Sequence, residues 1–122
     1  SIQVARQDVP GVRAPGMHHL HYAPLTKTIL INSFDLTSFL QSVAPQDLPI
    51  AVIKYSDIQV PINKQIQYVQ MPLTAVAYAH DIYHTLRTLD HQQFKKIIIE
   101  NVPAGTEWEA IRDRLMKATA ER

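Results

Sequence analysis

The sequence predicts a three-layer α/β domain in which helices cover both faces of a mostly parallel sheet. Short runs of β-branched and apolar residues alternate along the chain with longer segments whose apolar residues recur at helical spacing. The clearest runs are apolar at successive positions, as in strands that have both faces covered. With 122 residues, the chain is long enough for one domain of this kind with its own core.

Four strands are expected. They are Thr28–Ile31, Ile50–Ile53, Gln65–Met71 and Lys96–Val102. Thr28–Ile31 is β-branched and apolar, which suits a strand that is buried on both sides. A helix separates it from Ile50–Ile53, so we expect these two strands to pair in parallel through a right-handed crossover. Ile58–Lys64 also alternates, but Pro61 favours an edge or a loop there.

Three helices are expected between and after these strands. Their inward-facing residues recur at helical spacing: Leu36, Phe39, Leu40 and Val43 in the first; Ala75, Ala79, Ile82, Leu86 and Leu89 in the second, with Tyr78 and Tyr83 beside them; and Trp108, Ile111, Leu115 and Ala118 in the third. Polar residues within 32–35 can cap the first helix, and Thr74 can cap the second. Thr106 and Glu109 have the spacing of a capping box for the third.

Composition disfavours several classes of function. A net charge of +1 with scattered basic residues gives no electrostatic footprint for nucleic acid. The absence of cysteine excludes a disulfide framework, a thiolate nucleophile and cysteine-based metal sites. The apolar runs are far shorter than a membrane span, and the N-terminal residues do not have the pattern of a signal peptide. We therefore expect no membrane partner and a cytoplasmic location.

No constellation of catalytic or metal-binding residues is complete. The chain has no nucleophile elbow, and its three glycines do not form a phosphate-binding loop. His18, His19 and His21 lack helical i, i+4 spacing and a completing carboxylate. His80 and His84 have that spacing, but we expect them on the solvated face of the second helix. No catalytic residue, metal site or cofactor is therefore expected in this chain.

The most unusual stretch is Ala14–Pro24, which reads Ala-Pro-Gly-Met-His-His-Leu-His-Tyr-Ala-Pro. It holds three of the six histidines and has neither helical nor strand periodicity. Pro15-Gly16 favours a turn, and Pro24 disfavours helix at the residue before it. We interpret this stretch as a functional linker, with Ser1–Arg13 as a tether that follows another domain.

Three segments carry a family resemblance. Pro15–Pro24, Pro-Gly-Met-x-x-x-His-Tyr-Ala-Pro, resembles the interdomain linker of the long, two-domain form of threonylcarbamoyl-AMP synthase. Ile82–Asp90 is similar to that family's Leu-Tyr-x-x-Leu-Arg-x-Leu-Asp helix, and Ala110–Leu115 to its closing Ala-Ile-x-Asp-Arg-Leu. The three matches follow the family's order. The resemblance implies a tether at 1–13, a linker or lid at 14–24 and a Rossmann-like C-terminal accessory domain at 25–122.

The resemblance also implies what the linker does. In the family it folds over the nucleotide cleft of a preceding YrdC-like catalytic domain. That domain uses ATP, with a divalent cation, to convert threonine and bicarbonate into threonylcarbamoyl-AMP and pyrophosphate for the threonylcarbamoyladenosine modification of tRNA. The implied lid residues are Pro15, Gly16, Met17, His21, Tyr22 and Pro24. Many members have Lys-Tyr-Arg where this chain has His18-His19-Leu20, so His18 and His19 are weaker candidates for contacts with phosphate. The implied partners are this catalytic domain in cis and, indirectly, the tRNA-modification machinery.

Alternatives stay open at two levels. His21 and Tyr22 either close over a catalytic cleft or pack the linker onto this domain's own sheet. The domain as a whole is either this accessory domain or an independent Rossmann-like module that binds a nucleotide or a protein without catalysis. The missing glycine-rich fingerprint disfavours the nucleotide-binding module. A third hypothesis, less favoured than these two, is that the isolated domain is itself an enzyme.

Overall fold

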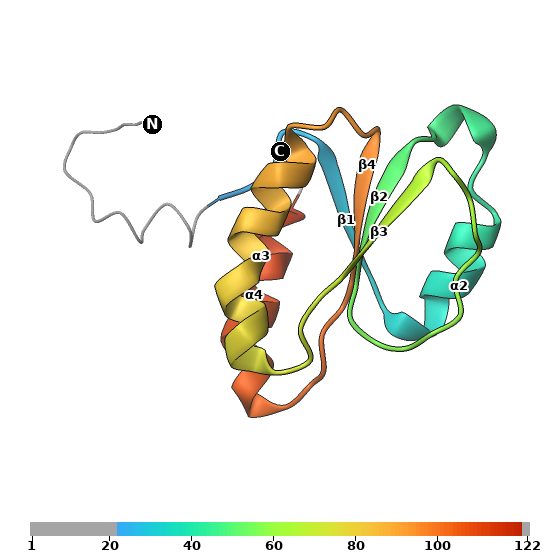
Figure 1. Ribbon diagram of the computed structural model, residues 1–122. Coiled ribbons are helices and arrows are strands. Elements are labelled where there is room, and N and C mark those ends of the chain that lie inside the picture. The colour runs from blue at the N-terminus through green and yellow to red at the C-terminus, as the bar shows by residue number, and fades with distance from the viewer. Residues whose placement is uncertain (1–21, 121–122) are drawn as a thin grey trace, which may run out of the picture.

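The computed structural model describes residues 22–120, which form an α/β domain with helices on both faces of one sheet (Figure 1). Its strands are β1 (Lys27–Ile31), β2 (Ile50–Lys54), β3 (Ile66–Gln70) and β4 (Lys96–Glu100). Its helices are α2 (Ser33–Gln41), α3 (Ala75–Asp90) and α4 (Glu109–Ala118), with short 3-10 helices at η1 (Pro45–Asp47) and η2 (Thr106–Trp108). Every strand and helix that the sequence predicts is present.

The strands form one sheet in the order β1-β4-β2-β3, and every neighbouring pair is parallel. The prediction that the first two strands pair directly was wrong, because β4 lies between β1 and β2. β4 contains the consecutive isoleucines Ile97–Ile99, all of which are completely buried. A strand that is apolar on both faces is best placed at the centre of the sheet, where both faces are covered.

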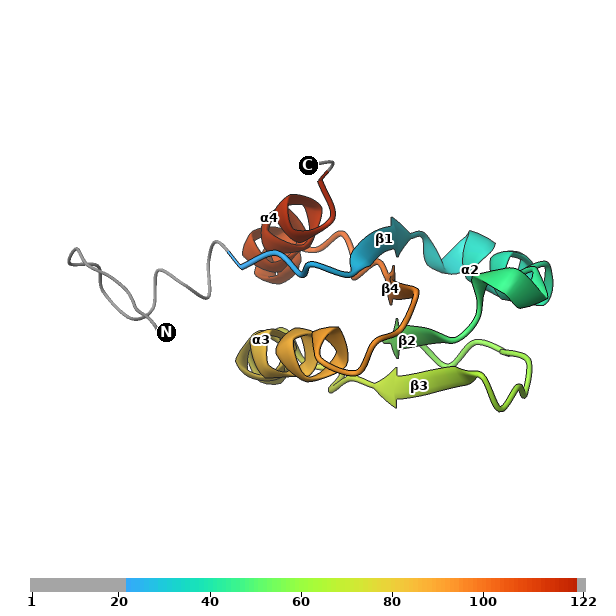
Figure 2. The ribbon, with the colours of Figure 1, turned by 90° about the horizontal axis from the view of Figure 1, so that it is seen from above.

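The helices make two layers around this sheet. Figure 2 shows α3 and α4 on one face of the sheet and α2 on the opposite face. The core on the α2 side contains Leu36, Leu40, Leu48, Ile50, Val52, Ile66 and Ile98. The core on the α3–α4 side contains, among others, Ile53, Tyr78, Ile82, Leu86, Leu89, Trp108, Ile111 and Leu115. These two cores confirm the predicted three-layer, Rossmann-like fold.

β1 differs from its prediction because it is an edge strand. Within Thr28–Ile31 only Thr28 is buried, and the three residues that follow are half-buried. Within residues 22–120, β1 pairs with β4 alone, so in this part of the chain it lies at the edge of the sheet rather than inside it. The segment Ile58–Lys64 has no regular secondary structure, as the proline within it indicated.

α3 follows its prediction closely. The Thr74 side chain accepts a hydrogen bond from the backbone N–H of Ala77 at 3.3 Å, which confirms the predicted cap. Tyr78 is completely buried, whereas His80 and His84 are exposed, as expected for the solvated face. Neither α3 nor any other helix within residues 22–120 is long and apolar enough to cross a membrane.

The start of α4 corrects a second prediction. Thr106 lies in a 3-10 turn, and α4 begins only at Glu109 without a hydrogen bond from a capping side chain. The predicted Thr106–Glu109 capping box is therefore not formed. Instead, the Arg112 guanidinium donates hydrogen bonds to the backbone oxygens of Pro103 at 2.6 Å and Gly105 at 3.1 Å. These bonds hold the loop before the helix in place of a capping box.

Candidate functional site

The described end of the linker is held by one carboxylate, Asp90, the last residue of α3. The Tyr22 hydroxyl donates a hydrogen bond to Asp90 Oδ2 at 2.7 Å, and the backbone N–H of Leu25 donates to the same oxygen at 3.1 Å. Thr26 donates to Oδ1 twice, from its backbone N–H at 2.9 Å and its hydroxyl at 2.7 Å. Asp90 therefore fixes residues 22–26 against the C-terminal end of α3. We call Tyr22, Asp90 and Thr26 the linker anchor.

The electrostatics of the linker anchor follow from these four donors. A carboxylate at a helix C-terminus is disfavoured by the helix dipole. Partial burial by itself would raise the pKa of Asp90, but hydrogen bonds from Thr26, Tyr22 and Leu25 outweigh this effect and hold the pKa below its ordinary value. Burial and the adjacent Asp90 carboxylate raise the pKa of Tyr22. The phenol therefore remains protonated and available as a donor at neutral pH.

The Tyr22 ring also packs on α3. It makes an edge-to-face contact with the Tyr83 ring, with the centroids 5.3 Å apart and the planes at 77°. Arg87 donates a hydrogen bond to the Tyr83 hydroxyl at 3.2 Å from one turn further along the helix. Tyr83, Arg87 and Asp90 all belong to the segment Ile82–Asp90 that carries the family resemblance. That segment therefore holds residues 22–26, which precede β1, against α3.

The remaining predicted lid residues fall into two groups. Pro15, Gly16, Met17, His18, His19 and His21 lie outside the described residues. Tyr22 and Pro24 are described: Tyr22 packs on α3, as in the packing alternative but against a helix rather than the sheet, and Pro24 is buried.

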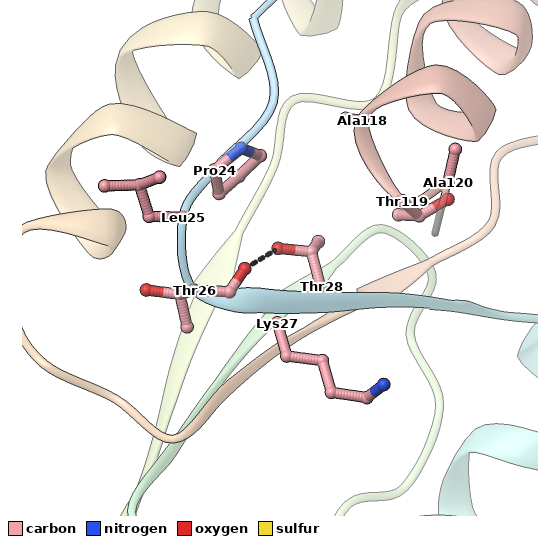
Figure 3. Close-up of a pocket in the computed structure, with 8 residues that line it drawn as sticks. All are labelled: Pro24, Leu25, Thr26, Lys27, Thr28, Ala118, Thr119 and Ala120. Carbon is pink, nitrogen blue, oxygen red and sulfur yellow. Dashed lines mark hydrogen bonds between the residues drawn. The ribbon is translucent and has the colours of Figure 1, made fainter. Parts of the chain in front are cut away.

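Pro24 borders a hollow of about 240 Å³ between the start of β1 and the end of α4 (Figure 3). The hollow is lined by Pro24, Leu25, Thr26, Lys27, Thr28, Ala118, Thr119 and Ala120. The Thr28 hydroxyl donates to the Thr26 backbone oxygen at 2.9 Å, and in Figure 3 the Lys27 side chain points to the opposite side of the strand from α4. The hollow lies directly beside the linker anchor, and among the described residues that line it only Lys27 is charged.

A second carboxylate, that of Glu100, lies at the C-terminal end of β4 and is completely buried. Its Oε2 accepts hydrogen bonds from the hydroxyls of Ser33, at 2.6 Å, and Ser56. Its Oε1 accepts from the backbone N–H groups of Tyr55 at 2.6 Å and Ser56 at 2.9 Å. Burial by itself would raise the pKa of Glu100, but these hydrogen bonds outweigh it and lower the pKa. Glu100 thereby ties the segments that follow β1 and β2 to the central strand.

The position of Glu100 limits what this edge of the sheet can bind. Open parallel α/β sheets usually bind ligands outside the carboxyl ends of their strands, where a helix N-terminus often meets a phosphate. Here Ser33, the first residue of α2, is directed to the Glu100 carboxylate instead. The negative charge of Glu100 repels a phosphate at this edge. The nearby hydroxyl and N–H groups already donate hydrogen bonds to Glu100.

Neither Asp90 nor Glu100 was predicted as a functional residue. The signal for Asp90 was its place at the end of the segment Ile82–Asp90 that carries the family resemblance, and the signal for Glu100 was an acidic residue at the end of an apolar strand. The exposed His80 lies 3.0 Å from the Asp81 carboxylate, and the exposed His91 lies 2.7 Å from the Arg87 backbone oxygen. Within residues 22–120 no three histidine or acidic side chains converge in a way that would hold a metal ion.

Comparison with known proteins assigns the family. Residues 2–120 match the family model described as threonylcarbamoyl-AMP synthase, C-terminal domain. Among solved structures, the crystal structure of P. abyssi Sua5 complexed with L-threonine is similar, with a TM-score of 0.64 and 19% identity over 81% of this chain. The match covers only 29% of that longer chain, and at this identity it shows a shared fold. No curated protein matches the chain. Because the family model spans nearly the whole sequence, the chain belongs to the threonylcarbamoyl-AMP synthase C-terminal domain family.

Proposed function

We propose that this chain is the accessory C-terminal domain, with its active-site-covering linker, of a two-domain threonylcarbamoyl-AMP synthase. In this proposal a YrdC-like domain in cis converts threonine, bicarbonate and ATP, with a divalent cation, into threonylcarbamoyl-AMP and pyrophosphate in the cytoplasm. The product then enters the tRNA-modification machinery. The observation that carries the proposal is the linker anchor, because Asp90 fixes the end of the linker to a rigid helix.

The anchor divides the linker into two functional parts. The lid residues of the proposal are Pro15, Gly16, Met17, His21, Tyr22 and Pro24, with His18 and His19 as weaker phosphate contacts. Of these, Tyr22 and Pro24 belong to the fixed base of the lid, which extends from Tyr22 to Thr26. A lid that closes over the cleft excludes water and protects a carbamate intermediate from hydrolysis. A fixed base shortens the free segment and so restricts the positions that the lid can reach.

An independent nucleotide-binding module is the weaker candidate. Such a module would use the carboxyl edge of the sheet, where Glu100 is buried among its own donors. A carboxylate at that place opposes binding of a nucleotide phosphate. The structure therefore favours a domain that positions the linker over one that binds a nucleotide itself.

The isolated 122-residue chain is expected to form no threonylcarbamoyl-AMP from threonine, bicarbonate and ATP. In the proposal, the nucleotide cleft belongs to the preceding domain. The measurement is release of radiolabelled pyrophosphate, with a two-domain threonylcarbamoyl-AMP synthase as positive control. Calorimetry should show ATP affinity no tighter than millimolar, about −4 kcal/mol. Pyrophosphate release that exceeds the protein-free blank and rises with the amount of chain would refute the accessory assignment.

A further inference from the structure

A second hollow lies on the opposite face of the sheet from the linker anchor, between the end of α2 and the amino ends of β2 and β4. It has a volume of about 160 Å³ and is lined by Phe39, Ser42, Val43, Ala44, Asp47, Ile50, Lys96 and Ile98. Five of these eight lining residues are apolar, and the other three are polar or charged. Cavities of about 150 Å³ accommodate a benzene ring, so a branched or aromatic side chain fits this volume.

Two oppositely charged side chains, Asp47 and Lys96, line this hollow. Within residues 22–120 neither side chain has a hydrogen bond or an ion pair, and so they do not pair with each other across the hollow. The neighbouring Lys95 is held differently, because its ammonium donates to the Gln46 backbone oxygen at 2.8 Å. This bond ties η1, and with it Asp47, to the start of β4. Among the described residues, the two charged side chains that line the hollow are therefore unpaired.

The surroundings separate the hollow into a positive and a negative side. Lys27 of β1 is in register with Lys96 of β4, so the two side chains emerge on the same face of neighbouring strands. Together they favour an anion at the edge formed by β1 and β4. On the other side, Asp47 and the carbonyl end of α2 near Ser42 favour a cation. A ligand matched to this hollow carries both charges and an apolar body.

We propose that this hollow binds an α-amino acid with an apolar side chain. Lys96, with Lys27 beside it, receives the carboxylate, and Asp47 receives the ammonium group. The side chain enters between Phe39, Val43 and the sheet, where its apolar surface is removed from water. The site lies on the α2 face, so it does not depend on the linker anchor or on the proposed enzyme.

The test uses the 122-residue chain and three probes that share one side chain. The probes are L-leucine, 3-methylbutylamine, which lacks the carboxylate, and 4-methylpentanoate, which lacks the ammonium group. We expect calorimetry to show millimolar or tighter binding of L-leucine and at least about tenfold weaker binding of either analogue. NMR shifts on titration should be confined to the α2–η1 segment and the start of β4.

Charge-specific variants make the test selective. Lys96→Gln is expected to weaken the binding of L-leucine about tenfold and to leave the binding of 3-methylbutylamine unchanged. Asp47→Asn should weaken the binding of both L-leucine and 3-methylbutylamine. The matched controls are Lys64→Gln and Asp57→Asn, which remove exposed charges outside the hollow. Melting temperatures confirm that each variant is folded. The proposal is overturned if the folded wild type binds no L-leucine at tens of millimolar, binds the three probes equally, or binds L-leucine equally well after both pocket substitutions.

Discussion

Glu100→Gln is expected to lower the free energy of unfolding by about 2–4 kcal/mol. Glu100 is completely buried, and both of its carboxylate oxygens accept hydrogen bonds from hydroxyl or backbone donors. Glutamine has the same shape, but it is neutral and its amide nitrogen cannot accept a hydrogen bond. The substitution therefore removes the negative charge that strengthens these hydrogen bonds, and it leaves either the two backbone N–H groups or the two serine hydroxyls without their acceptor oxygen. Urea denaturation measures the difference.

Glu107→Gln is the matched control, because Glu107 is exposed and should change stability by less than about 0.5 kcal/mol. The pH dependence gives a second readout. The folded pKa of Glu100 is lowered, so its contribution to stability is present above its unfolded value of about 4.3 and is lost as the pH falls through the folded pKa. Glu100→Gln should therefore cost less at low pH than at pH 7. A cost that is small at pH 7, or that grows on acidification, would contradict the structural role of Glu100.

Leu86→Ala is expected to lower the free energy of unfolding by about 2–5 kcal/mol. Leu86 is buried in the core between α3 and the sheet, and its truncation removes apolar contacts and leaves a cavity. His84 lies two residues earlier on the exposed face of the same helix. His84→Ala should cost no more than about 0.5 kcal/mol and serves as the control. If His84→Ala proves the more damaging change in thermal or urea denaturation, the faces of α3 have been assigned the wrong way round.

The spacing of apolar residues predicted the helices and strands of this fold well, because a helix with one buried face and a fully buried strand each have a characteristic apolar pattern in the sequence. It did not predict the order of the strands. The first two strands looked like a directly paired βαβ unit, but the sheet places Ile97–Ile99 of β4 between them. The strand order depends on which strand has the most apolar surface to bury, and this is a property of all four strands together rather than of one βαβ unit. The capping box at Thr106 failed for a related reason, since Arg112 from the next turns of the helix holds the loop instead.

The candidate site was predicted only in part. Tyr22 was found through the linker sequence, but its acceptor, Asp90, lies 68 residues further along the chain. Apart from its place at the end of the segment that carries the family resemblance, nothing local distinguishes Asp90 from a solvated acidic residue at a helix end. The same holds for Glu100, whose donors come from the segments after β1 and β2. Long-range hydrogen bonds of this kind become visible only when the strands and helices are placed together.

The sharpest test of the linker anchor is the turnover of a two-domain enzyme in which a YrdC-like catalytic domain precedes this chain. Asp90→Asn keeps the size of the side chain but replaces one accepting oxygen with a donor, which should loosen the attachment of residues 22–26, the base of the proposed lid. Tyr22→Ala is less selective, because it also removes the contact with Tyr83. Asp113→Asn, at an exposed pair with Lys117 on α4, is the matched control.

Pyrophosphate release by Asp90→Asn should fall about tenfold or more, because a displaced lid no longer completes the site. His21→Ala, in the lid itself, should lower turnover with an almost unchanged melting temperature, and Asp113→Asn should behave like the wild type. If Asp90→Asn melts at a lower temperature but releases pyrophosphate at the wild-type rate, the anchor only stabilises this domain and does not position a lid.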